Sequence, residues 1–195
     1  MKQKIVSIDN LQKIIHKEKN KGKKIVLCHG VFDLLHIGHI KHFKEAKNFG
    51  DILVVSLTPD IYVNKGSNRP TFNEKLRVEA IASLHAVNYV VLNTTPTANN
   101  IIQKIRPNIY CKGPDYKNHQ NDVSDQIKNE IRTVKNVGGK IIYTGDITFS
   151  SSKLLNQYGD VYTNMQKMFI KKIKKNHSFL KIRKLIDKFK KIKVL

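Results

Sequence analysis

The chain has 195 residues, of which 40% are hydrophobic. That length fits one α/β domain of ordinary size with an appendage and is too short for two full domains. No apolar run approaches the roughly 20 residues that a membrane span needs, and the first residues lack the apolar segment of a secretion signal, because Asp9 and Asn10 interrupt it. We therefore expect a cytoplasmic protein with no membrane span.

The net charge of +21 raises the question of a nucleic-acid partner. Most basic residues are lysines, and isoleucine and asparagine are abundant as well, a joint bias that indicates codon composition. Residues 165–195 hold twelve lysines or arginines against the single acid Asp187. Aromatic side chains that could stack on bases are sparse there. We expect no specific nucleic-acid binding and a positive field that attracts a polyanionic small substrate.

Strands and helices alternate along the chain with short connections. Continuous apolar runs predict strands at residues 23–30, 51–57, 88–93, 108–113 and 140–145. Apolar residues at helical spacing predict helices at residues 9–20, 37–49, 71–84, 96–105 and 122–137, and one that starts at the serines 150–152. This order predicts a Rossmann-like, doubly wound, five-stranded parallel sheet with helices on both faces.

The sequence suggests three parts. Residues 1–21 form an N-terminal helix that packs on the domain, and residues 22–158 form the α/β domain. Residues 159–195 form a basic C-terminal helical tail, with apolar side chains at amphipathic spacing. The two cysteines, Cys28 and Cys111, lie in apolar strand-like runs without CxxC spacing, so we interpret them as buried structural thiols.

The segment 28–39, with the sequence CHGVFDLLHIGH, carries the densest chemistry. It follows the first predicted strand, and ligands of such sheets bind at the carboxyl ends of strands. Gly30 lets a ligand approach the backbone. His36 and His39 are three residues apart at a helix N-terminus, with Gly38 between them, and helix N-termini bind phosphates. The pair is therefore suited to donating hydrogen bonds to phosphate oxygens.

The segment has two other interpretations, a zinc cluster and a purely structural role. His29, His36, His39 and His42 could form a zinc cluster, but cysteine and acidic ligands are missing from the right spacing. A purely structural role explains poorly why glycines, an aspartate and paired histidines occur together. We therefore expect no metal ligands among the protein side chains.

The stretch GVFDLLHIGH resembles the HxGH signature of the nucleotidyltransferase superfamily. Class I aminoacyl-tRNA synthetases share that motif, but they need a much longer chain and a KMSKS loop. The sequence is more similar to the cytidylyltransferase-like family, over about residues 22–156. That family includes glycerol-3-phosphate cytidylyltransferase and the nucleotidyltransferase domain of bifunctional heptose-phosphate kinase/adenylyltransferases.

The resemblance rests on further segments and implies a set of site residues. NKGSNRP resembles the mobile basic loop of the family, IRPNIYCKGPDY its fourth strand and loop, and TFSSSKLL its serine/threonine element. The implied catalytic residues are His36, His39, Lys65, Arg77 and Ser151. The implied nucleotide-binding residues are Gly30, Val31, Phe32, Gly38, Lys112, Gly113, Asp115, Ser150 and Ser152. Asp33 and Arg69 are the implied substrate-binding residues.

Some of these residues also have ordinary structural interpretations. Arg77 could be a solvated helix residue, the serines could form only an N-cap, and Lys65 could be one more exposed lysine. Two departures from the family bear on the substrate. Thr144, Gly145 and Asp146 stand where glycerol-phosphate enzymes carry an arginine, and residues 153–155 lack the arginine of the coenzyme A and NAD-pathway enzymes.

The resemblance implies transfer of AMP or CMP from ATP or CTP to a phosphorylated small molecule, such as heptose 1-phosphate, with release of pyrophosphate. Mg²⁺ would accompany the triphosphate. Glycerol-3-phosphate cytidylyltransferase activity and a non-catalytic nucleotide-binding module stay open as alternatives. A homodimer and a sugar kinase, fused or separate, are partners consistent with this family, and the basic tail would then be a linker to the kinase.

Overall fold

A computed structural model describes residues 4–66, 69–116 and 126–145, together with the helical residues 165–166, 168–169 and 171–172. The chain divides into two compact units, Met1–Lys153 and Leu154–Leu195. The predicted serine element at 150–152, the helix after it and nearly all of the basic tail lie outside the described residues. In the described part of the chain, no helix is long and apolar enough to cross a membrane.

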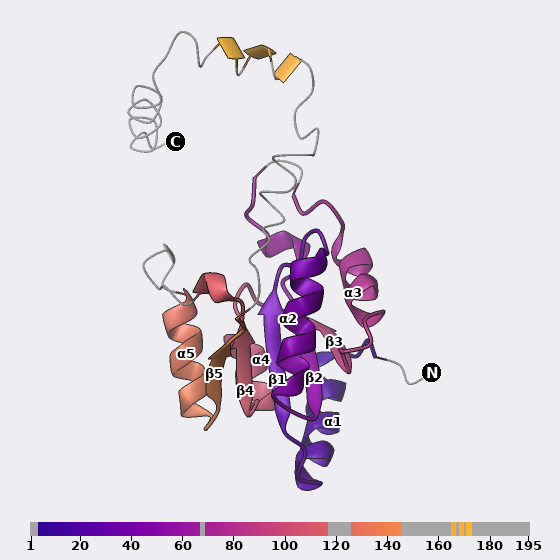
Figure 1. Ribbon diagram of the computed structural model, residues 1–195, viewed down its shortest axis with the longest axis vertical. Helices are drawn as coiled ribbons and strands as arrows, with labels where there is room; N and C mark the ends of the chain where they lie inside the picture. The colour runs from indigo at the N-terminus through magenta and orange to yellow at the C-terminus, as the bar shows by residue number, and fades with distance from the viewer. Residues whose placement is uncertain are drawn as a thin grey trace, which may run out of the picture. The chain divides into compact units, whose positions relative to one another are not determined.

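The first unit contains the alternating elements that the sequence predicts (Figure 1). The strands are β1 (Ile25–Gly30), β2 (Ile52–Leu57), β3 (Tyr89–Leu92), β4 (Ile109–Lys112) and β5 (Lys140–Tyr143). The helices are α1 (Ile8–Asn20), α2 (Ile37–Asn48), α3 (Glu74–Ala82), α4 (Asn99–Ile105) and α5 (Gln126–Asn136). Two short 3₁₀ helices, η1 (Asp60–Tyr62) and η2 (Pro114–Tyr116), follow β2 and β4.

The five strands form one parallel sheet in the order β3-β2-β1-β4-β5. The chain runs from β1 outward to β3 and then returns to β4 on the other side of β1. The order therefore reverses between β1 and β4, and this switch point is where such sheets bind ligands. Cys28 of β1 lies opposite Cys111 of β4 in the register.

Each face of the sheet has its own apolar core. Side chains of α1, α4 and α5 pack on one face, around Leu27, Val54 and Tyr110. Side chains of α2 and α3 pack on the other face, around Val26, Leu53 and Phe43. Both faces are covered, so the doubly wound parallel sheet is confirmed (Figure 1).

The start of α3 differs from the prediction. The helix begins at Glu74 rather than Thr71, because the Asn73 side chain caps it by accepting from Leu76 N at 3.0 Å. The Glu74 carboxylate accepts from the backbone N–H of Asp60 at 2.8 Å. This contact ties the start of α3 to η1, beside the carboxyl end of β2.

Candidate active site

The turn between β1 and α2 is tightly packed and has an unusual backbone. Phe32 adopts a positive φ of 48°, a left-handed conformation that is uncommon for a bulky residue. A Cβ on Gly30 would lie 3.0 Å from the Phe32 ring, so this glycine makes room for the aromatic side chain. The Phe32 ring packs edge-on against His39, with 5.3 Å between ring centroids. Phe32 therefore orients a predicted catalytic histidine, a role that the sequence did not reveal.

His36 and His39 lie together at the N-terminus of α2, as the sequence predicts. Their rings are stacked, with centroids 3.8 Å apart and an interplanar angle of 18°. His36 is the N-cap residue, and its side chain makes no capping hydrogen bond. Gly38 stands between them in the first helical turn, where an ideal α-helix leaves backbone N–H groups without an intrahelical acceptor, although here His39 N donates to the His36 carbonyl at 3.0 Å. The Nδ1 atom of His39 has no hydrogen-bond partner among the described residues.

The electrostatic setting keeps these imidazoles neutral. Desolvation, together with the nearby His36, His42 and Lys65, lowers the pKa of His39 to about 3. Desolvation also lowers the pKa of His36. A neutral imidazole carries one N–H donor, and an anion placed beside it favours protonation. The pair can therefore donate hydrogen bonds to phosphate and gain positive charge when phosphate binds.

Arg77 is placed differently from the expectation that its guanidinium meets phosphates or solvent. The residue is only 2% exposed. Its Nη2 donates to the Thr58 carbonyl at 2.9 Å and to the Asp60 carboxylate at 2.6 Å, and its Nη1 donates to the Val31 carbonyl. The guanidinium thereby joins the loops that follow β1 and β2. We propose that Arg77 acts as a positioning residue of the site.

Asp33 and Arg69 form an ion pair behind the turn. The Asp33 carboxylate is 1% exposed and accepts from Arg69 Nε and from the backbone N–H of Thr71. Asp33 thus connects the β1–α2 turn to the basic loop. Arg69 Nη2 has no hydrogen-bond partner within the described ranges. That buried end of the guanidinium is the part that still offers a donor.

A polar cavity of about 440 Å³ opens beside the turn, on the α5 side of the sheet. Four of the predicted site residues line it, namely Gly30, Val31, Lys65 and Lys112. Its other lining residues are His29, Thr58, Tyr62, Asn64, Pro96, Tyr116, Gln126, Ile127 and Glu130. The cavity adjoins the switch point, and its wall includes Lys112 at the end of β4 and Lys65 from the loop that follows η1.

Lys112 and Glu130 form a buried ion pair in this wall. The Lys112 Nζ atom lies 3.2 Å from the Glu130 carboxylate, which also accepts from the Tyr110 hydroxyl at 2.8 Å and from Ala98 N at 3.0 Å. Desolvation alone would raise the pKa of Glu130, but Lys112 and these hydrogen bonds hold it below its usual value. The ammonium also lies 4.6 Å from the centre of the Tyr116 ring.

Glu130 and His29 are site residues that sequence reasoning missed. Glu130 shares one face of α5 with the buried Ile127 and Val134, and an acid on an apolar face was the available signal. His29 is buried, with Nδ1 3.1 Å from Ser56 Oγ, and its pKa falls to about 4 through desolvation and the charge of Lys112. Both line the cavity.

Several predicted residues are described only in part. Gly113 follows β4, and its carbonyl accepts from Tyr116 N at 3.2 Å. Asp115 belongs to η2, where only its backbone is described. Ser150, Ser151 and Ser152 lie outside the described residues, so their predicted roles are neither supported nor opposed by the geometry.

Comparison with known proteins places this site in a family. The family model described as "Cytidylyltransferase-like" matches residues 27–184. The bifunctional protein HldE of Aliarcobacter butzleri is 39% identical over 138 residues, which are 70% of this chain and 29% of that protein. The protein of the same name from Geobacter metallireducens is 36% identical, over 80% of this chain and 32% of its own length. The chain thus spans about a third of the length of these relatives.

Solved structures agree with this assignment. A lipopolysaccharide core biosynthesis protein from Thermoplasma volcanium matches with a TM-score of 0.55 and 28% identity, over 65% of this chain and 100% of its own. A pantoate-β-alanine ligase from Francisella tularensis, 20% identical with a TM-score of 0.52, covers 87% of this chain with 77% of its own and shares the fold. The chain belongs to the cytidylyltransferase-like family of nucleotidyltransferases.

Proposed function

We propose that this domain transfers AMP or CMP from a nucleoside triphosphate to a phosphorylated sugar, such as heptose 1-phosphate, with release of pyrophosphate. The observation that carries the proposal is the stacked His36–His39 pair at the N-terminus of α2, beside a polar cavity at the switch point. Helix N–H groups and neutral imidazoles suit a triphosphate, and the cavity offers a separate space for the acceptor.

The reaction needs positioning and charge neutralisation. An oxygen of the acceptor phosphate attacks the α-phosphorus, the bond to the bridging oxygen breaks, and pyrophosphate leaves. The attacking oxygen is already anionic near neutral pH, so no general base is required. His36 and His39 stabilise charge on the phosphate oxygens, and Lys65 neutralises the leaving group. Arg77 supports them indirectly by fixing the backbone at Val31.

We propose that Mg²⁺ enters as part of the nucleotide substrate. Asp33 is occupied by Arg69 and by the Thr71 N–H, and Asp60 is paired with Arg77. The carboxylates of Asp33 and Asp60 therefore do not offer a set of ligands for a hard cation. Mg²⁺ would be held by phosphate oxygens and water, which is its usual arrangement with nucleotides.

The cavity suits a polyhydroxylated acceptor better than an apolar one. Its lining combines the His29 ring, the Thr58 hydroxyl and the Lys112–Glu130 pair with the aromatic ring of Tyr116. Buried groups of this kind pair with sugar hydroxyls, and a site built on them rejects ligands that lack those hydroxyls. Lys65 lines the same cavity and interacts electrostatically with His39, so it would lie between the two substrates.

The test is a pyrophosphate-release assay of the full chain with Mg²⁺. ATP and CTP are each combined with a panel of phosphates that contains heptose 1-phosphate, other sugar 1-phosphates and glycerol 3-phosphate. The proposal expects turnover that requires a sugar 1-phosphate. Turnover only with CTP and glycerol 3-phosphate would favour the glycerol-phosphate alternative. Nucleotide binding without turnover for any acceptor would favour a binding module.

A further inference from the structure

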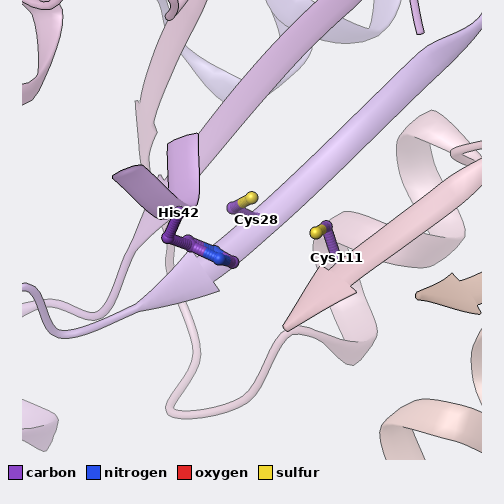
Figure 2. A group of neighbouring side chains, drawn as sticks. All are labelled: Cys28, His42 and Cys111. Carbon is purple, nitrogen blue, oxygen red and sulfur yellow. The ribbon is translucent and has the colours of Figure 1, made fainter. Parts of the chain in front are cut away.

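A second cluster of reactive side chains lies outside the site described above. Cys28 comes from β1, Cys111 from β4 and His42 from α2 (Figure 2). Each residue offers one possible ligand atom, and these three atoms lie within 4.8 Å of one another. Two buried thiols alone would be ordinary core packing, but the imidazole that α2 brings to them makes a ligand set.

The register of the sheet explains why the thiols meet. Cys28 and Cys111 are direct partners on adjacent parallel strands, so their side chains leave the sheet on the same face. That face is covered by α2, which carries His42. Strand pairing and helix packing therefore fix all three donors, although the two cysteines lie 83 positions apart in the sequence.

We propose that Cys28, Cys111 and His42 form a binding site for a zinc-type divalent cation. In a tetrahedral zinc site, ligand atoms at about 2.3 Å for sulfur and 2.0–2.1 Å for nitrogen are roughly 3.5–3.8 Å apart. The three donors already lie within 4.8 Å, so small side-chain movements suffice. Two thiolates balance the charge of one divalent cation, which suits a site with fully buried sulfurs.

The surroundings of His42 fit a metal ligand. Its Nδ1 lies 3.0 Å from Thr144 Oγ1. In the tautomer that donates the Nδ1–H to this hydroxyl, Nε2 keeps a lone pair for a metal. Desolvation and the charge of Lys112 lower the pKa of His42 to about 4, so the ring is neutral at physiological pH. The repulsion of a cation by Lys112 is offset by the Glu130 carboxylate paired with it.

Binding would exchange protons for the metal. Burial raises the pKa of Cys28 well above its usual value, so the thiol is protonated in the metal-free protein. A thiol must lose its proton to bind the metal as a thiolate, so binding would release protons to solvent. The bound ion would join β1, β4 and α2, the elements that converge on the switch point.

The experiment uses the full chain, reduced, stripped of metal with a chelator and titrated with Co²⁺ as a spectroscopic probe. We expect one Co²⁺ per chain with a thiolate-to-cobalt charge-transfer band in the near ultraviolet, and displacement of Co²⁺ by Zn²⁺. Zn²⁺ should also raise the midpoint of thermal unfolding and release protons on binding. A protein that binds no Co²⁺, or binds it without the charge-transfer band, would overturn the proposal.

Variants locate the ion. Cys111→Ser and His42→Ala should each weaken Co²⁺ binding at least tenfold, whereas the exposed His16→Ala is the matched control and should bind as the parent does. Circular dichroism identifies any variant that fails to fold, and the thiolate charge-transfer band of the parent protein then decides, because the chain has two cysteines. Equal binding by folded Cys111→Ser and parent would show an adventitious surface ion and overturn the site.

Discussion

Arg77 is buried, and its guanidinium holds together the segments around the site. Its four hydrogen-bond acceptors belong to the loops that follow β1 and β2 and to the segment before α3. A guanidinium has five donors in a fixed fork, so one arginine can hold several backbone segments at once. The consequence is that its removal should act first on stability.

We expect Arg77→Ala to lower the free energy of unfolding by roughly 3 kcal/mol, because it leaves buried carbonyls and the Asp60 carboxylate without their donor. Urea denaturation measures this change. Arg132→Ala is the matched control, since Arg132 is exposed on α5, and it should change stability by less than about 0.5 kcal/mol. An Arg77→Ala protein of unaltered stability that lacks activity would instead make Arg77 a phosphate ligand.

His29 makes stability depend on pH. Its native pKa of about 4 lies below the ordinary 6.5, so the unfolded chain binds its proton first as the pH falls. Its contribution is complete above pH 6.5 and is lost progressively as the pH falls toward 4. Replacement by His29→Gln should therefore reduce the slope of unfolding free energy in this window by up to about 1.4 kcal/mol per pH unit.

Chemical denaturation at several pH values measures that slope. The exposed His16→Gln is the matched control. His39 and His42 also have depressed pKa values, so part of the slope should persist in the His29→Gln variant. A slope that His29→Gln leaves unchanged would contradict the burial of a neutral imidazole at this position.

For single residues, the sequence predicted which side chains belong to the site better than it predicted which groups they contact. The spacing of His36 and His39 was enough to predict that their rings lie together, because residues three apart are neighbours on a helix surface. The role of Arg77 could not be predicted, because its acceptors are backbone carbonyls of distant loops. Carbonyls are present at every residue and leave no pattern in the sequence.

Two helices place side chains at the switch point, one from each face of the sheet. The N-terminus of α2 carries the histidine pair on one face, and α5 carries Glu130 on the other. Glu130 connects α5 to two other elements. It contacts Lys112 and Tyr110 of β4 and Ala98 at the start of α4. The position of the Lys112 ammonium in the cavity therefore depends on α5.

Glu130→Gln should destabilise the protein by about 3–5 kcal/mol, because it leaves the Lys112 ammonium buried without its counter-charge. A double-mutant cycle with Lys112→Met measures the coupling, and the double variant should recover part of the loss. The exposed Glu79→Gln is the matched control and should be nearly neutral. Additive effects of Glu130→Gln and Lys112→Met would rule out the coupling.

The elements themselves were largely predictable. Continuous apolar runs marked all five strands, and short connections between strands and helices predicted a parallel doubly wound sheet. The beginning of α3 was predicted two to three residues early, because several side chains between Thr71 and Glu74 are capable of capping. The cavity could not be predicted, since it depends on how far α5 stands from the ends of β1 and β4.

The whole chain carries a net charge of +21, and much of the excess lies in residues 165–195. A positive field raises the local concentration of a polyanion and is weakened by salt. We expect deletion of residues 160–195 to preserve nucleotidyl transfer, because every described site residue precedes residue 145. At low ionic strength, the shortened chain should have a higher KM for the nucleoside triphosphate than the full chain. At high ionic strength, the two KM values should match.

Steady-state kinetics at two salt concentrations tests this prediction. Circular dichroism establishes that the shortened chain is folded. A folded chain that is inactive at every ionic strength would give the basic tail a direct part in the reaction. A sugar kinase, fused or separate, remains our proposal for the enzyme that supplies the acceptor phosphate, and its product should be the best acceptor in the release assay.

The central claim is that the histidine pair at the start of α2 stabilises the reacting phosphates. The most direct measurement is the kcat of pyrophosphate release for His39→Ala, with His16→Ala as the control. We predict a loss of at least about 100-fold for His39→Ala, as expected when a donor to developing charge is removed, with the folded structure retained. An unimpaired His39→Ala enzyme would contradict the account.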